Sequence, residues 1–172
     1  MIKFCVFLEL LDRIFKRKHG SRYFKVYKNE DDFYAFELPV EWNHIETSDL
    51  YGRIFSDSQI LEGKIMIKTV DSFYQDFDEY LNDLVGALEK HNNYRITSKE
   101  KIKITGHDAL EAEFQAQAMV GKQSVDAIVK NIIINDKTRE RFVSITFSIL
   151  ARDYGKYKII YQRLRKTFKF LA

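Results

Sequence analysis

The sequence contains one cysteine, Cys5, and one proline, Pro39, among its 172 residues. A single cysteine cannot form an intrachain disulfide or a thiolate metal cluster, which fits a reducing compartment. One proline against fourteen Phe and ten Tyr is not the composition of a disordered chain. We therefore expect one ordered domain, because a chain of this length supplies one sizeable core and is too short for two ordinary ones.

Long apolar runs are also absent. No run approaches the roughly 20 residues that a membrane-spanning helix needs. The stretch 4–11 is interrupted by Glu9, is followed by Asp12 and has no small-residue cleavage site after it, so we do not expect a signal peptide. The sequence predicts a soluble and cytoplasmic protein.

The common motifs of catalysis and cofactor binding are missing. The seven glycines form neither a GxGxxG motif nor a P-loop, so no nucleotide cofactor is expected. There is no G-x-S-x-G nucleophile elbow, and Cys5 is better explained as a structural thiol than as a nucleophile. The histidines fall in predicted loops or turns without metal-ligand spacing, so no metal site is expected; they are His19, His44, His91 and His107.

One pair of carboxylates resembles a catalytic pair. Glu111 and Glu113 are two residues apart in a predicted strand, so both side chains point to the same face. Gln115 and Gln117 continue the row, which favours a solvated strand face. The sequence therefore predicts no catalytic residue, and we do not expect an enzyme.

Charge is segregated along the chain. The net charge is only +3, but residues 1–28 and 151–172 each carry about +6 and the middle about −9. If the two ends meet, a basic face lies opposite an acidic body. Nucleic acid is disfavoured as a partner, because the middle is acidic and the aromatic residues of the basic C-terminal helix lie on its sheet-facing side.

Residues 3–18 are expected to form an amphipathic helix with a Phe-rich face and a basic end. We assign residues 1–20 to this helix and 21–172 to a single domain. The helix either covers its own sheet or binds a protein partner or an anionic membrane surface. The candidate partner-binding residues are Phe4, Phe7, Leu11, Phe15, Lys16, Arg17 and Lys18.

Period-two and helical patterns define the rest of the chain. Two further helices are expected, one opening at Ser72 or at Asp76 and one after an Asp153 cap. Short turns between consecutive strands predict antiparallel pairing. The fold class is therefore α+β, an antiparallel sheet of about six strands flanked by helices. Strands are expected at 23–26, 34–38, 94–104, 110–118, 125–134 and 143–149, with further candidates at 53–55 and 64–70.

Three segments, FELPVEW at 36–42, ITGHDALEAEF at 104–114 and YGKYKIIYQRLRKTFKF at 154–170, resemble the PsbP-like and Mog-type α/β/α sandwich superfamily, including the bacterial group represented by DcrB. The resemblance covers roughly residues 30–170 and concerns structural motifs. It implies a non-enzymatic role, since members include photosystem accessory subunits, a Ran-binding import factor, envelope lipoproteins and chaperones of secreted effectors. The residues expected to be structural are Trp42, Gly106, Phe114 and Phe168.

The expected function is a non-catalytic protein-binding module, namely an accessory subunit, an adaptor or a chaperone that uses a sheet face or edge. The alternative is a peripheral membrane protein that docks through residues 1–18 and binds lipid or an apolar ligand. A third possibility is an enzyme with an unfamiliar site, which requires a polar pocket with perturbed carboxylates. No cofactor is expected.

Overall fold

The structure is a computed structural model that describes residues 23–45, 52–56, 63–71, 74, 76–89, 94–120 and 122–172. The expected helix at 3–18 lies outside the described residues. The helices are α2 (Phe77–Glu89) and α3 (Tyr154–Thr167), with a 3₁₀ turn at Ala151–Asp153 before α3. The strands are β1 (Phe24–Asn29), β2 (Tyr34–Pro39), β3 (Asn43–Ile45), β4 (Arg53–Ser56), β5 (Gly63–Asp71), β6 (Tyr94–Ile104), β7 (His107–Val120), β8 (Gln123–Asp136), β9 (Arg141–Leu150) and β10 (Lys169–Phe170).

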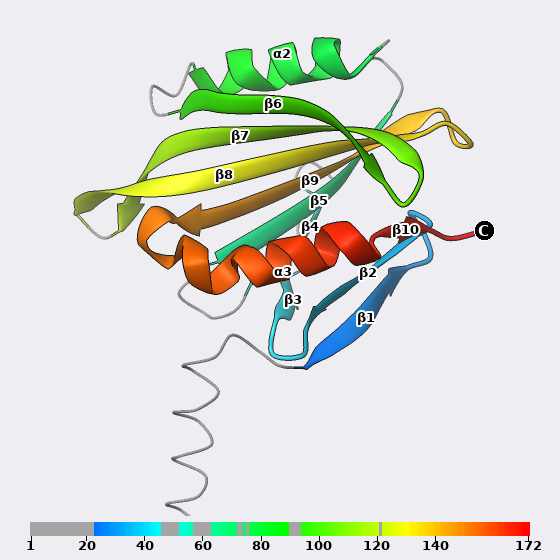
Figure 1. Cartoon of the computed structure of the whole chain (residues 1–172), viewed down its shortest axis with the longest axis horizontal. Helices are drawn as coiled ribbons and strands as arrows, with labels where there is room; N and C mark the ends of the chain where they lie inside the picture. Colours follow the sequence, from blue (N-terminus) through cyan, green and yellow to red (C-terminus); the bar gives the residue numbers. More distant parts are fainter. Residues whose placement is uncertain are drawn as a thin grey trace, which may run out of the picture.

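The strands form two antiparallel sheets (Figure 1). The large sheet has seven strands in the order β3-β4-β5-β9-β8-β7-β6, and the small sheet has the order β1-β2-β10. The expectation of one sheet of about six strands is therefore wrong in number. The first hairpin pairs with the two-residue strand after α3 and not with the large sheet, and a pairing so distant in sequence leaves no local pattern.

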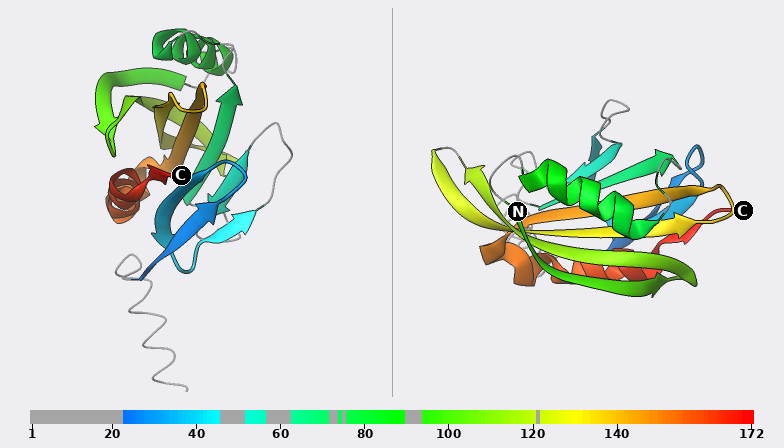
Figure 2. Two further views of the ribbon diagram at one scale, coloured as in Figure 1. Left: turned by 90° about the vertical axis from the view of Figure 1, so that its right-hand side faces the viewer. Right: turned by 90° about the horizontal axis from the view of Figure 1, so that it is seen from above.

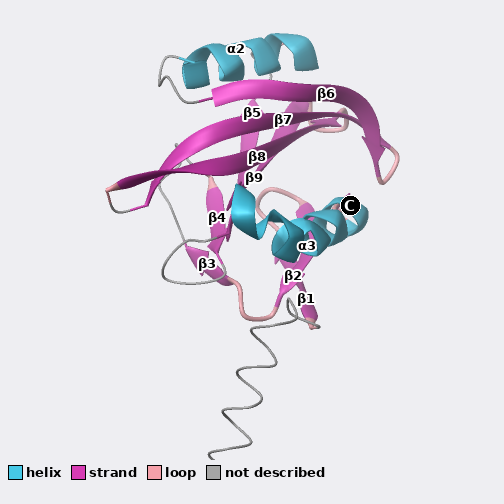
Figure 3. Ribbon diagram, turned by 60° about the vertical axis from the view of Figure 1, so that its left-hand side comes forward, coloured by secondary structure: helices cyan, strands magenta, loops and turns pink. Residues whose placement is uncertain are grey.

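The two faces of the large sheet are covered differently (Figures 2 and 3). Helix α2 packs on one face, above β7, β8 and β9. Helix α3 and the small sheet lie side by side on the other face and enclose the larger core. This second core contains Trp42 and Phe168, whereas Phe114 belongs to the core under α2, and all three side chains are at most 2% exposed.

The alternation of apolar and polar residues along β7 reflects the two different faces of the large sheet. The even-numbered side chains of β7, including Leu110, Ala112 and Phe114, are buried under α2. Its odd-numbered side chains point to the face that α3 covers, because side chains alternate between the faces of a sheet. Both long faces of the sheet are thus partly covered.

The β6–β7 hairpin closes through a two-residue turn, Thr105 and Gly106, with φ values of 46° and 91°. Two positive φ angles are typical of the type I′ turn, which matches the twist of paired strands. Strand β7 consequently starts at His107, three residues before the expected start of this strand at 110. Gly106 suits its position, but Thr105 is β-branched and rarely adopts this conformation.

The starts of the two helices differ from each other. Asp76 caps α2, since its Oδ1 accepts a hydrogen bond of 2.9 Å from the backbone N–H of Glu79. Asp76 was the competing start in the sequence, and Ser72, the first expected start, lies outside the described residues. Asp153 occupies the N-cap position of α3 as expected, but it follows a 3₁₀ turn and its side chain makes no capping hydrogen bond. Its carboxylate instead pairs with Arg152.

Candidate binding surface

The two helices carry opposite charge on opposite faces of the large sheet (Figure 2). Helix α2 has four acidic residues and no basic one, and α3 has five basic residues and no acidic one. The acidic residues of α2 extend the acidic middle of the sequence, and α3 belongs to its basic end. The structure thus places a basic helix opposite an acidic one within the described residues, with Asp78 of α2 paired to Lys99 and Lys101 of β6.

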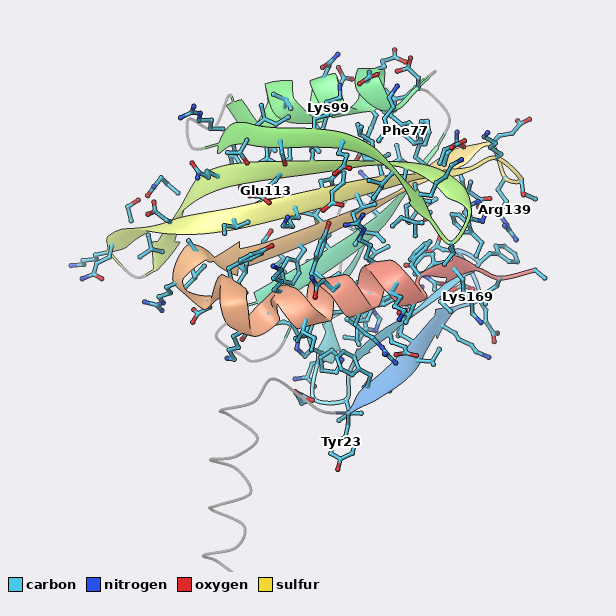
Figure 4. The ribbon with its side chains drawn as sticks, viewed as in Figure 1. Tyr23, Phe77, Lys99, Glu113, Arg139 and Lys169 are labelled. Carbon is cyan, nitrogen blue, oxygen red and sulfur yellow. The ribbon has the colours of Figure 1, made fainter. Side chains whose placement is uncertain are left out.

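The solvent side of α3 continues into the outer face of the small sheet. Cross-strand partners share a face, and Val26 pairs with Glu37 in the β1–β2 register. Glu37 in turn bonds to Arg163 of α3, so the two elements meet there. We call this continuous region the α3–β1 surface, and it comprises Phe24, Val26, Lys28, Lys156, Ile159, Arg163 and Lys169 (Figure 4 labels Lys169).

Arg163 holds the α3–β1 surface together. Its Nε donates to the Glu37 carboxylate, and its guanidinium lies 5.5 Å from the ring centroid of Phe24. The Glu37 backbone N–H also donates to Oγ1 of Thr167, 3.0 Å away, in place of a strand partner. These contacts fix α3 against the small sheet, so the surface is rigid where the two elements join.

Apolar side chains stand among the charges of this surface. Val26 and Ile159 are both 57% exposed. Tyr23 and Val40 are also exposed and are joined by a backbone hydrogen bond at the end of the β1–β2 hairpin (Figure 4). Exposed apolar side chains gathered beside an Arg on a rigid element are typical of a surface that another molecule covers.

The other flank of α3 rests on a charged network. The Tyr161 hydroxyl donates a 2.6 Å hydrogen bond to Glu111 Oε1, and Arg165 Nη1 lies 2.9 Å from Glu111 Oε2. Lys130 pairs with Glu113 and lies 3.9 Å from Glu111. The side chains of Glu111 and Lys130 are each only 12% exposed. The network therefore connects α3 to β7 and β8.

This arrangement corrects the prediction of a solvated row on β7. Gln115 and Gln117 are exposed as expected, but α3 covers Glu111 and partly covers Glu113. Burial, followed by the hydrogen bond and charge of Glu111, raises the pKa of Tyr161 well above its ordinary value. Burial lowers the pKa of Lys130, but the hydrogen bond and charge of Glu113 outweigh it and raise that pKa.

The buried network does not have the layout of a catalytic carboxylate pair. Each carboxylate is already engaged by a cation or a phenol, and α3 closes the space above Glu111. No group of three or more His, Cys, Asp or Glu side chains in the described residues could hold a metal ion. His44 and His107 instead pack against the aromatic rings of Phe55 and Phe170.

Beside the network, α3 and the β6–β7 turn border a groove of about 450 Å³. Its charged lining is entirely basic. The lining residues are Lys103, Ile104, Thr105, Gln162, Arg165 and Lys166.

The candidate partner-binding residues of the sequence, Phe4, Phe7, Leu11, Phe15, Lys16, Arg17 and Lys18, lie outside the described residues. The α3–β1 surface was not among the predicted sites. The sequence did contain a signal for it, because α3 combines five cations with no acidic residue. The contribution of β1 could not be found in this way, since its position beside α3 depends on the tertiary fold.

No protein-family model matches the sequence, and no curated protein matches it. None of the helices in the described residues is long and apolar enough to cross a membrane.

Solved structures share the fold at low identity. The chain is similar to cyanobacterial PsbP from Synechocystis sp. PCC 6803, with a TM-score of 0.63 and 11% identity over 88% of this chain and 94% of that one. It is equally similar to the Ran-binding protein Mog1p of Saccharomyces cerevisiae, with a TM-score of 0.63 and 10% identity over 88% and 97%. LpqN of Mycobacterium tuberculosis, involved in cell envelope biogenesis, gives 0.57 and 9% over 87% and 91%. The described part of the chain therefore has the PsbP/Mog-type fold.

Proposed function

We propose that the protein is a non-catalytic binding module, an accessory subunit, adaptor or chaperone, that binds an acidic partner protein through the α3–β1 surface. The observation that carries this proposal is a helix with five cations and no acidic residue beside exposed apolar side chains. Apolar contacts supply affinity at such interfaces, and complementary charge supplies specificity and speed of association.

The opposite charges of α3 and α2 favour the approach of an acidic partner from the side of α3. An approaching acidic surface is attracted by α3 and repelled by α2 on the far face. Association should therefore slow as salt is added, because ions screen exposed charges over about 8–10 Å at physiological ionic strength.

The open edge of the large sheet is a weaker binding site. Strand β6 ends the sheet and is largely exposed, but it carries four cations and a bulge between Ile96 and Ser98. Lysines and bulges are the devices that prevent an edge strand from pairing with another chain. We therefore assign partner contact to the α3–β1 surface and not to this edge.

The N-terminal segment extends this proposal. Residues 1–22 join the described part of the chain at Tyr23, which stands at the border of the α3–β1 surface (Figure 4). We therefore propose that Phe4, Phe7, Leu11 and Phe15 add apolar contacts and that Lys16, Arg17 and Lys18 add charge.

The likeness to Mog1p and PsbP supports a binding role by analogy of fold only. Mog1p is described as a Ran-binding protein, and the identity of 10% carries no partner over to this chain. A cytoplasmic location is part of the proposal and rests on the single cysteine.

The test is affinity capture from the source organism with two matched variants. Ile159→Glu places a negative charge on the α3–β1 surface, and Ile96→Glu makes the same change at an isoleucine of β6 that is 39% exposed. We expect a stoichiometric partner that the wild type and Ile96→Glu both retain, that Ile159→Glu loses and that is released as salt rises. A partner held equally by both variants would refute the assigned surface.

The membrane alternative is tested separately. Vesicles containing anionic lipid are floated at low and high salt with full-length protein and with protein lacking residues 1–20. Flotation that depends on residues 1–20 would favour peripheral membrane docking over a protein partner. Flotation at neither salt would remove that alternative.

A further inference from the structure

The groove between α3 and the β6–β7 turn contains side-chain donors that the fold does not use. The Gln162 amide and the Lys166 ammonium make no hydrogen bond or ion pair within the described residues. Arg165 contacts only Glu111 there, through one terminal nitrogen, although a guanidinium has five N–H donors. An amide, an ammonium and a guanidinium therefore line one groove with hydrogen-bond donors that no described residue accepts.

The wall opposite α3 is built with backbone strain. Thr105 has a φ of 46°, a conformation that is costly for a β-branched residue. Its hydroxyl donates a 2.8 Å hydrogen bond to the backbone carbonyl of Phe168, just after α3. This bond holds the turn against the end of the helix, and strained residues that are fixed in this way concentrate at binding sites.

The local charge balance is positive. Lys103 and Lys137 share Asp108 and lower the pKa of its carboxyl to about 2. Arg165 and Lys130 are balanced by Glu111 and Glu113. Lys166 has no counter-ion among the described residues. Together these groups leave an excess of two positive charges. This excess balances the charge of a phosphate monoester, which is about −1.5 to −2 at pH 7.

The helix dipole could also account for the position of the cations, but it does not account for the other features of the groove. Arg165 and Lys166 lie in the last turn of α3, where the helix dipole favours cations. The dipole explains neither the unpaired Gln162 amide nor the strained Thr105 across the groove.

We propose that this groove binds the phosphate group of a small soluble phosphate monoester. Arg165 presents its fork to two phosphate oxygens, with Glu111 and Tyr161 holding the guanidinium in place. Gln162 and Lys166 donate to the remaining oxygens, and the Thr105 side lines the far wall. Arg165, which anchors this site, lies on the flank of α3 that faces β7, whereas Arg163 lies on the flank that faces the small sheet, and the site is independent of the proposed partner.

The test is an NMR titration of the full chain with inorganic phosphate and with O-phosphoserine. We expect saturable shifts in the amides of Thr105, Gly106, Gln162, Arg165 and Lys166 with both probes. Gln162→Glu should weaken the Kd by about tenfold or more through repulsion. Arg165→Lys should weaken it by about tenfold, because it keeps a cation beside Glu111 and removes the fork.

The matched control is a charge removal elsewhere. Lys166→Gln should weaken binding several-fold, and Lys122→Gln, at the far end of the β7–β8 hairpin, should leave the Kd unchanged. Equal weakening by these two variants would show a diffuse charge effect and overturn the site. Shifts that do not saturate, or binding to vesicles of phosphatidic acid without binding of either free phosphate, would also overturn it. Val26→Glu, on β1 of the α3–β1 surface, should not change this titration, so the two proposals can be tested separately.

Discussion

The hydroxyl of Tyr161 donates a hydrogen bond of 2.6 Å to Glu111 and so joins the basic helix α3 to the middle of β7. Both groups are largely removed from water, and the nearby Lys130 ammonium lies 5.4 Å from the Tyr161 ring centroid. The pair stands beneath the helix that carries both proposed binding sites. The strength of this hydrogen bond therefore affects how firmly α3 is held against the large sheet.

Removal of this hydroxyl should destabilise the protein. Tyr161→Phe keeps the ring in the core but leaves Glu111 with one bond fewer, and an unsatisfied buried acceptor costs about 1–3 kcal/mol. Urea denaturation should show this loss of unfolding free energy. Tyr94→Phe is the control, because Tyr94 is half-buried on β6 and its hydroxyl makes no hydrogen bond within the described residues. Equal stabilities of Tyr161→Phe and the wild type would mean that water replaces the bond.

The buried tyrosines predict sensitivity to alkali. Burial is the main cause that raises the pKa of both Tyr161 and Tyr34 above the ordinary value near 10. The unfolded chain releases these protons first, so stability is fully present below about pH 10 and falls as the pH rises above it. Urea midpoints measured between pH 8 and pH 11 should show the fall, with the phenolate absorbance of the buried tyrosines appearing only on unfolding. Tyr161→Phe should make it less steep, and phenolate formation by all tyrosines near pH 10 in the native protein would contradict the prediction.

The sequence predicted those parts of the fold that depend on local alternation. Strand β6 has the expected bounds of 94 and 104, and the alternating apolar residues of β7 and β9 are buried as the period-two pattern required. The resemblance in three segments predicted the sandwich, which the similarity to PsbP and Mog1p confirms. Each of these features can be read within one segment of the chain.

The features that the sequence did not predict depend on contacts between distant segments. Glu111 was assigned to water, because alternation identifies the face of a strand but not the helix 50 residues later that covers it. The small sheet depends on β10, two residues that become a strand only when α3 brings them beside Ala35. The groove likewise needs Thr105 and Gln162 to meet across the fold. Candidate sites made of distant segments required the structure.

Substitution of Trp42 tests how much the larger core contributes to stability. The Trp42 side chain is 2% exposed and packs edge-on against Tyr157 of α3, with ring centroids 6.2 Å apart. Trp42→Ala leaves a large cavity and should cost about 3–5 kcal/mol of unfolding free energy. Val40→Ala, two residues away and exposed, should change it by less than about 0.5 kcal/mol. A shift for Trp42→Ala no larger than that of Val40→Ala would show that the core does not depend on this ring.

Two glycines predict opposite effects of the same substitution. In Gly86→Ala, the new Cβ meets no described atom within 4 Å, and glycine inside a helix costs about 0.5–1 kcal/mol relative to alanine. This variant should therefore be more stable than the wild type by that amount. In Gly52→Ala, the Cβ would lie 2.2 Å from the backbone oxygen of Ile67 at a φ of +69°, so the backbone must move and stability should fall by more than about 1 kcal/mol.

Urea midpoints of the two glycine variants, measured side by side, decide this prediction. The comparison reports on α2 in particular, because Gly86 lies on the helix that carries the acidic face of the molecule. A Gly86→Ala variant less stable than the wild type would mean that another part of the chain packs against α2 at this point. The acidic face would then be partly covered, and the repulsion that directs an acidic partner to α3 would be weakened.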